Sequence, residues 1–116
     1  SRQKIRYAYA LAEADIDYAA LRSMSDADVL KTLTAVTGVG VWTAEIYLKF
    51  SLGRADAFAA GDLALQIAAQ DLFDLPDRPT PAQLRKLAEP WSPWRSVAAR
   101  ILWAYYRVRK QRDGIR

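Results

Sequence analysis

Helical periodicity is the feature that most constrains the fold of this chain. Apolar residues recur three or four positions apart, and no stretch alternates apolar and polar residues for the length of a β-strand. Helix-start signals accompany this pattern: Ser25 precedes acidic residues, and Thr80-Pro81-Ala82-Gln83 is a capping box with proline at the first helical position. The sequence therefore predicts an all-α fold.

The helix boundaries can be predicted from these start signals and from the positions of glycine and proline. We expect helices over residues 2–14, 25–36, 41–52, 62–73, 80–90 and 93–112, and a short helix or turn within 16–24. Gly53 is expected to end the third of these helices, and loops are expected at 54–61 and 74–79. In the last helix Val97, Ile101, Ala104 and Val108 form one apolar stripe. No repeat or linker divides the chain, so residues 1–116 are expected to form one domain.

Two missing residue types exclude several kinds of site. The chain has no cysteine, which excludes disulfides, thiolate zinc sites and iron–sulfur clusters, and no histidine, which excludes Ser-His triads and imidazole ligands. Acid–base chemistry must then come from Asp, Glu, Lys or Tyr. The 17 basic and 13 acidic residues give a net charge of +4, which suits a nucleic-acid partner without requiring one. No apolar run is long enough to span a membrane.

A glycine-containing turn joins two of the expected helices. Thr37-Gly38-Val39-Gly40 places backbone N–H groups at the start of a helix, where they suit a phosphate oxygen. Glycine permits φ > 0 and lets a DNA backbone approach closely. An ordinary helix–helix connection also favours glycine, and the residues alone leave both interpretations open.

Asp62 follows the loop 56–61 and precedes an apolar helix. Aspartate is a preferred N-cap, so helix capping is the commoner role at such a position. A carboxylate at a loop–helix junction can also face a cleft, where it would stabilise a developing cation or orient a water molecule. The residues alone leave this choice open as well.

Aromatic and basic side chains give two further alternatives. The four tryptophans, Trp42, Trp91, Trp94 and Trp103, fit a helical core or a slot in which a flat base stacks. The basic cluster near the end of the chain fits a solvated helix face or a surface that contacts phosphates. This cluster comprises Arg95, Arg100, Arg107, Arg109, Lys110, Arg112 and Arg116, against one acid, Asp113.

Four motifs occur in a fixed order along the chain. They are Leu-x-x-Val-x-Gly-Val-Gly-Val-Trp-Thr-Ala at 33–44, Asp-x-Phe-x-x-Gly-Asp-Leu-Ala-Leu-Gln at 56–66, Thr-Pro-x-Gln-Leu-Arg at 80–85 and Trp-x-Pro-Trp-Arg-Ser-x-Ala at 91–98, followed by Trp103. In this order they resemble the helix-hairpin-helix DNA glycosylase superfamily, and within it the 3-methyladenine DNA glycosylase II branch. The match runs from Ser1 to about Arg107 and corresponds to the C-terminal portion of the family domain.

The resemblance implies a fold and a function. The fold would be an orthogonal helical bundle with a helix-hairpin-helix motif at 26–52, a catalytic loop and helix at 54–73 and C-terminal helices at 80–112. The function would be base-excision repair by a monofunctional DNA glycosylase. Such an enzyme flips an alkylated purine such as 3-methyladenine out of the duplex and hydrolyses its N-glycosidic bond.

Site residues follow from the motifs that match the family. Asp62 matches the catalytic aspartate, which stabilises an oxocarbenium-like sugar and helps water attack. Trp42, Ile46 and Trp103 match the base pocket, where indoles would stack on a positively charged alkylated base. The residues expected to bind the DNA backbone are Thr37, Gly38, Val39, Gly40 and Thr43.

The resemblance also implies an ion, a partner and a location. Carbonyl groups of Thr34, Val36 and Val39 match those that hold a structural Na⁺ or K⁺ at the hairpin, and no other cofactor is required. The expected partner is double-stranded DNA with damaged bases, in a bacterial cytoplasm and associated with the nucleoid. The oligomeric state is left open.

The chain departs from the family pattern at a few positions. Bifunctional relatives, endonuclease III and 8-oxoguanine glycosylase, carry a nucleophilic lysine at the position of Trp42, so no Schiff-base lyase step is expected here. Ile46 stands where some members place a tyrosine. Ala59 and Gly61 stand in the loop where many members have a proline and a second acid.

Length is the largest departure. Family members carry helices before the segment that matches Ser1, and these complete the bundle and fill the gap left by the flipped base. We therefore expect a partial domain that exposes an apolar face or self-associates, and whether it catalyses alone is open. Two alternatives remain: a non-catalytic helix-hairpin-helix fragment that binds DNA regardless of damage, and a purely structural helical protein. Trp42, Asp62 and Trp103 favour the glycosylase, because a binding module needs only the hairpin.

Overall fold

Every regular element in the described part of the chain is helical. The computed structural model describes residues 1–112. Its helices are α1 (Arg2–Glu13), α2 (Tyr18–Leu21), α3 (Asp26–Thr34), α4 (Val41–Ile46), the π-helix η1 (Tyr47–Ser51), α5 (Leu63–Leu72), α6 (Pro81–Ala88), the 3₁₀ helix η2 (Glu89–Trp91) and α7 (Arg95–Arg112). The all-α prediction is confirmed. Asp113 and Arg116 of the basic cluster lie outside the described residues.

Side-chain caps begin the helices where the sequence predicted them. The Ser25 hydroxyl accepts a hydrogen bond from the Asp28 backbone N–H at 3.1 Å. Thr80 and Gln83 form the complete capping box, with Pro81 in the first turn of α6. These caps satisfy backbone donors that have no partner inside the helix.

Two boundaries differ from the prediction. The helix expected over 41–52 widens into a π-helix from Tyr47, and Gly53 follows it with φ of +64°. The last helix begins at Arg95 instead of Pro93, and the Ser92–Pro93 bond is cis. The Asp56 carboxylate accepts hydrogen bonds from the Ser92 hydroxyl at 2.7 Å and from the Arg95 backbone N–H at 3.2 Å. Asp56 therefore caps the start of the helix at Arg95.

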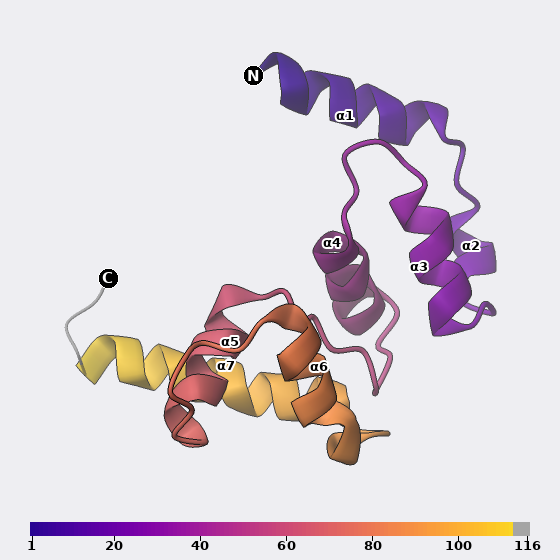
Figure 1. Cartoon of the computed structure of the whole chain (residues 1–116). Coiled ribbons are helices and arrows are strands. Elements are labelled where there is room, and N and C mark those ends of the chain that lie inside the picture. The colour runs from indigo at the N-terminus through magenta and orange to yellow at the C-terminus, as the bar shows by residue number, and fades with distance from the viewer. Residues whose placement is uncertain (113–116) are drawn as a thin grey trace.

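The helices pack in two groups (Figure 1). The first group is α2, α3, α4 and η1, whose buried core contains Leu21, Val29, Leu33, Ala44 and Leu48. The second group is α5, α6 and α7, and its buried core is Phe58, Ala60, Leu65, Ala68, Ala69, Leu84, Ala88, Ala99 and Leu102. The loop 54–62 contributes to both cores, through Ala57 and Phe58 respectively. It therefore holds the two groups together.

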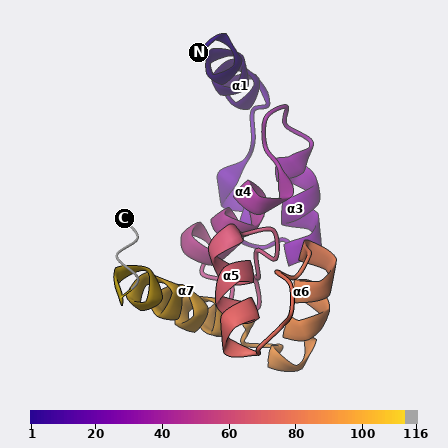
Figure 2. The same cartoon turned by 60° about the vertical axis from the view of Figure 1, so that its left-hand side comes forward.

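Two helices expose apolar surface. α1 lies beyond the rest of the molecule and has no buried residue, with Ile5 and Tyr9 exposed (Figure 2). The predicted apolar stripe of α7 is also exposed, because the residues that α7 buries are Ser96, Ala99 and Leu102. An exposed apolar face was expected of a partial domain. None of the helices within residues 1–112 has the length and apolar character needed to cross a membrane.

Candidate active site

Asp62 lies at the junction of the loop and α5, where it caps the helix. Its Oδ1 accepts the Leu65 backbone N–H at 3.1 Å, and its own N–H donates to the Ala59 carbonyl at 2.9 Å. The Gln66 side chain donates to the Ala60 carbonyl at 2.9 Å and secures the same loop end. The capping interpretation of Asp62 is therefore confirmed, and the carboxylate is held in a defined position.

Two tryptophans converge on the same carboxylate from other helices. Trp42 of α4 donates its indole N–H to Asp62 Oδ2 at 2.9 Å, and Trp103 of α7 donates to Oδ1 at 3.2 Å. These contacts join residues 20 and 41 positions apart in the chain. The structure thus brings together the three residues that the resemblance grouped by role. Ile46 lies one turn after Trp42 and is half-buried.

The donors around Asp62 are all electrically neutral. Within residues 1–112 the ion pairs join Arg54 to Asp26, Arg85 to Glu45, Arg95 to Asp56 and Arg109 to Asp71. Asp62 has no such partner there and accepts only indole and amide N–H groups. Its negative charge is therefore oriented but not neutralised, as stabilisation of a developing cation requires.

The opposite end of the loop is fixed by an ion pair. Asp56 accepts two hydrogen bonds from the Arg95 guanidinium, at 2.8 and 2.7 Å, and one from Ser92. The hydrogen bond from Arg95 is the largest of the effects that hold the pKa of the Asp56 carboxyl well below its usual range. Asp56 is thus anchored to the start of α7.

Ser96 adds a second anchor between the loop and α7. Its hydroxyl accepts the Ala57 backbone N–H at 3.0 Å, and its own N–H donates to the Ala55 carbonyl at 2.8 Å. The Ser96 hydroxyl also lies within hydrogen-bond distance of the Arg54 and Ala57 carbonyls. The loop before Asp62 therefore runs along the first turn of α7, the helix that carries Trp103.

The face of Trp103 contacts a lysine and a phenylalanine. Lys49 Nζ lies 4.5 Å from the Trp103 ring centroid, and the Phe50 ring stacks with Trp103 at 5.8 Å with 19° between the planes. Burial, with the charge of Arg100 as a second cause, lowers the pKa of Lys49 to about 8. Part of the Trp103 surface that would meet a flipped base is thus already in contact with other side chains.

Thr37 to Gly40 lie between α3 and α4 on the outside of the molecule, and Thr43 lies in the first turn of α4. Thr37, Gly38, Gly40 and Thr43 are exposed, and Val39 is half-buried. Gly38 has φ of +94°, as the turn was expected to need, but Gly40 has φ of −91° and is the N-cap of α4. The freedom of glycine to adopt positive φ is therefore used at Gly38 and not at Gly40, whose extended conformation any residue adopts. The Tyr7 ring of α1 lies against Gly38, where a Cβ would be 2.3 Å from a ring carbon.

The carbonyl groups predicted to hold a monovalent cation lie in this turn. The Val36 carbonyl accepts the Val39 backbone N–H at 3.0 Å. A carbonyl oxygen has two lone pairs, so this bond leaves Val36 able to bind an ion as well. A cation site at the carbonyl groups of Thr34, Val36 and Val39 stays a prediction.

The basic cluster is partly engaged in contacts within the molecule. Arg95 binds Asp56, and Arg109 binds Asp71, whose carboxylate also accepts the Tyr105 hydroxyl. Of the tryptophans, Trp91 packs against the core of α5, α6 and α7, where it meets Phe58 and Phe73, and Trp94 is exposed. Of the four tryptophans, all within the described residues, Trp42 and Trp103 are therefore the two that hydrogen bond to Asp62.

Two charged residues near the site were not singled out from the sequence. Glu45 and Lys49 are both buried, at 4% and 5% exposure, and they follow Trp42 by three and seven positions. Glu45 accepts two hydrogen bonds from the Arg85 guanidinium at 3.2 Å. Residues three and seven positions apart lie on the same face of a helix, so the charges of Glu45 and Lys49 on the face that carries Trp42 could have identified both residues.

Comparisons with known proteins identify relatives of the chain. No family model matches the chain. An alkylbase DNA glycosidase-like protein of Schizosaccharomyces pombe is 36% identical over 72% of the chain, and DNA-3-methyladenine glycosylase 1 of the same yeast is 38% identical over 69%. The matched segments are 39% and 35% of those relatives, so the chain spans only part of their length.

Solved structures show the same relationship. A 3-methyladenine DNA glycosylase of Schizosaccharomyces pombe in complex with abasic DNA matches 89% of the chain with a TM-score of 0.79 and 34% identity. A DNA-3-methyladenine glycosidase of Bacillus halodurans matches 91% with a TM-score of 0.77 and 32% identity. The chain covers 52% and 51% of those two structures. The fold, the ordered motifs and these similarities together show that the chain belongs to the helix-hairpin-helix DNA glycosylase family, as a part of its domain.

Proposed function

We propose that the chain belongs to a monofunctional DNA glycosylase that removes alkylated purines such as 3-methyladenine from double-stranded DNA. The observation that supports this most is the Asp62 carboxylate, which two indole N–H groups and one backbone amide orient without neutralising it. The names of the relatives point to the same reaction. The proposal includes action on nucleoid DNA in a bacterial cytoplasm.

Asp62 would act on the sugar of the flipped nucleotide. When the bond between C1′ and the base nitrogen breaks, its electron pair leaves with the base and C1′ becomes cationic. An unpaired carboxylate stabilises that cation in a site where few other charges compete. Water then adds to C1′, and Asp62 is suited to accept the proton that the water loses.

Trp42 and Trp103 would have two roles in this site. Their indole N–H groups fix the carboxylate, and their rings offer π surfaces to the base. An alkylated purine carries positive charge, so an electron-rich indole favours it over an undamaged base. Trp42, with 47% of its surface exposed, offers the more accessible ring, and Ile46 would add apolar contact beside it.

The hairpin would bind the DNA backbone next to the lesion. Thr37, Gly38, Val39, Gly40 and Thr43 present backbone and hydroxyl groups on one turn, and nothing occupies the space where a Gly40 side chain would project. Carbonyl groups of Thr34, Val36 and Val39 would hold a Na⁺ or K⁺ there, which supplies positive charge beside the phosphates. In this proposal the chain is divided into the hairpin at 26–52, the catalytic loop and helix at 54–73, and the C-terminal helices at 80–112.

A non-catalytic DNA-binding fragment is the second candidate. The exposed stripe of α7 and the absence of any buried residue on α1 favour it, because a complete catalytic domain would cover such surfaces. This candidate predicts binding that depends on salt but not on damage.

Single-turnover release of the base from alkylated duplex DNA tests the first proposal. The parent chain is compared with Asp62→Asn, because asparagine caps a helix as well as aspartate does and the fold is retained. Asp74→Asn is the matched control: Asp74 is an exposed aspartate with φ of +51°, a conformation that asparagine also tolerates. Release at equal rates by the parent and the control, and much slower release by Asp62→Asn, is expected. Binding without release by all three would favour the non-catalytic fragment.

A further inference from the structure

Lys49 is a buried charge that the proposed reaction does not use. Its side chain extends from η1, and the residue is 5% exposed. Removing an ammonium group from water costs free energy unless other groups compensate for the lost solvation. Among the ion pairs of residues 1–112, none involves Lys49. Its burial must be supported by other contacts.

Those contacts are one carbonyl and two aromatic rings. Lys49 Nζ donates a hydrogen bond to the Ser96 backbone carbonyl. The same nitrogen lies 4.5 Å from the centroid of Trp103 and 5.7 Å from that of Phe50. Both distances are within the range in which a cation is attracted to an aromatic face. The Lys49 ammonium group is therefore held by the Ser96 carbonyl and lies against the face of the Trp103 ring.

Trp103 is also held by its hydrogen bond to Asp62, in addition to its contact with Lys49. The face of the ring contacts Lys49 and Phe50, while the N–H edge donates to Asp62 Oδ1 at 3.2 Å. A side chain held at both its face and its edge cannot rotate without losing one of the two interactions. Trp103 thus contacts both Lys49 and Asp62 and links the two residues.

We propose that Lys49 is a positioning residue, which holds the Trp103 indole in the plane where its N–H meets Asp62. The proposal rests on the proposed function, because Asp62 is the reacting group there. Lys49 itself touches no reacting atom, since its contacts are Ser96, Phe50 and Trp103. Its removal should free the indole and leave Asp62 with one oriented donor fewer.

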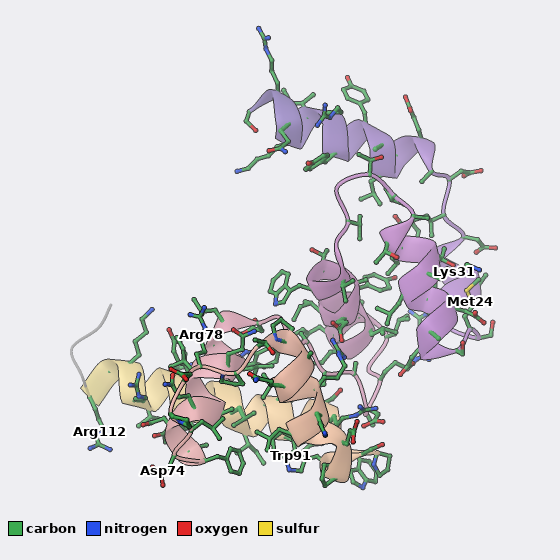
Figure 3. All side chains as sticks on the ribbon, in the orientation of Figure 1. Met24, Lys31, Asp74, Arg78, Trp91 and Arg112 are labelled. Atoms are coloured by element: carbon green, nitrogen blue, oxygen red, sulfur yellow. The ribbon has the colours of Figure 1, made fainter. Side chains whose placement is uncertain are left out.

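Indole ¹H–¹⁵N resonances of the 116-residue chain test this without DNA. The four tryptophans give four signals, and Trp103→Phe identifies the one of Trp103. Lys49→Met keeps the length of the side chain but removes its charge, and we expect the Trp103 signal to move by more than the other three. Lys31→Met is the matched control, because Lys31 is exposed on α3, on the side of the molecule away from α7 (Figure 3). It should leave all four signals in place.

Two further variants separate charge from packing. Lys49→Arg keeps a cation that stacks on aromatic rings and should return the Trp103 signal toward its parent position. Lys49→Gln keeps an N–H donor without a charge and should behave as Lys49→Met does. If Lys49→Met fails to fold, Lys49→Gln takes its place in every comparison.

Base release gives the functional measurement. Lys49→Met should slow single-turnover release about tenfold while the dissociation constant for alkylated DNA stays unchanged. An unmoved Trp103 signal, or an equal shift of all four indoles, would overturn the positioning role. If the parent chain binds DNA but releases no base, the non-catalytic fragment is favoured over the proposed function, and the indole signals still decide whether Lys49 positions Trp103.

Discussion

Asp56 and Asp62 lie at opposite ends of one loop and have opposite surroundings. Asp56 is bound by the Arg95 guanidinium and the Ser92 hydroxyl, and its charge is neutralised by an ion pair. Asp62 is bound by two indoles and one amide, which are neutral donors. The same residue type thus stabilises the structure at one end and presents an unpaired charge at the other. Both carboxylates accept several hydrogen bonds, and the charge of the donors is what separates their roles.

Exchanging each aspartate for asparagine should separate the two roles, with the largest effect at Asp62. We expect Asp62→Asn to slow single-turnover base release on the order of a hundredfold, because the neutral amide no longer stabilises the cationic sugar. The free energy of unfolding should change little, since the cap is retained. Kinetics and urea unfolding on the same preparation check both parts. A fully active Asp62→Asn chain would remove Asp62 from the mechanism.

Asp56→Asn should have the reverse profile. The amide cannot form the ion pair with Arg95, and we expect the free energy of unfolding to fall by about 2 kcal/mol. Base release per folded molecule should stay at the parent rate. The measurement is urea unfolding, with activity corrected for the folded fraction. If Asp56→Asn lost activity without losing stability, Asp56 would not have the structural role that sets it apart from Asp62.

Acid should reveal the stabilising contribution of Asp56. The folded-state pKa of Asp56 is held well below the unfolded value of about 3.9, chiefly by its hydrogen bond from Arg95. Its stabilising contribution is therefore fully present above that unfolded value and is lost as the pH falls toward the folded pKa. Between about pH 5 and pH 3 the parent should lose more unfolding free energy than Asp56→Asn does. Parallel curves for the two chains would contradict the assignment.

Trp42→Phe should have the smallest effect. The change keeps an aromatic face but removes the indole N–H that Asp62 accepts at 2.9 Å. We expect base release to slow roughly three- to tenfold, which corresponds to about 1 kcal/mol, the typical net contribution of one hydrogen bond. Stability should hardly change, because Trp42 is 47% exposed. Single-turnover rates and thermal unfolding check this, and an effect as large as that of Asp62→Asn would mean that the ring does more than orient the carboxylate.

Local signals in the sequence predicted the helix starts, because a cap involves residues only a few positions apart. Ser25 and Thr80 both cap as expected. The start of α7 was wrong because its cap is Asp56, 39 positions before Arg95, and no local pattern reports such a contact. The apolar stripe of α7 does not mark its buried face. The helix packs through the small residues Ser96 and Ala99 instead, and Ser96 lets the loop approach closely.

The sequence allowed the roles of the site residues to be predicted, but not the contacts between them. Trp42, Asp62 and Trp103 were grouped by resemblance, and the structure joins them through hydrogen bonds across 20 and 41 positions. Lys49 was not predicted, because the helix was expected to place apolar residues toward the core. A lysine can be buried there only because the π faces of Trp103 and Phe50 and the carbonyl of Ser96 compensate its charge, and these partners come together only in the folded chain.

The position of Ser96 has a consequence for protein design. This one small residue binds the loop through its hydroxyl and N–H groups, and binds Lys49 through its carbonyl. A designer who wished to transplant the Asp62 carboxylate onto another helical scaffold could not move α5 and its cap alone. The transferred unit would also need the loop 54–62 and α7, because α7 holds the loop through Ser96 and supplies the Trp103 indole to the carboxylate.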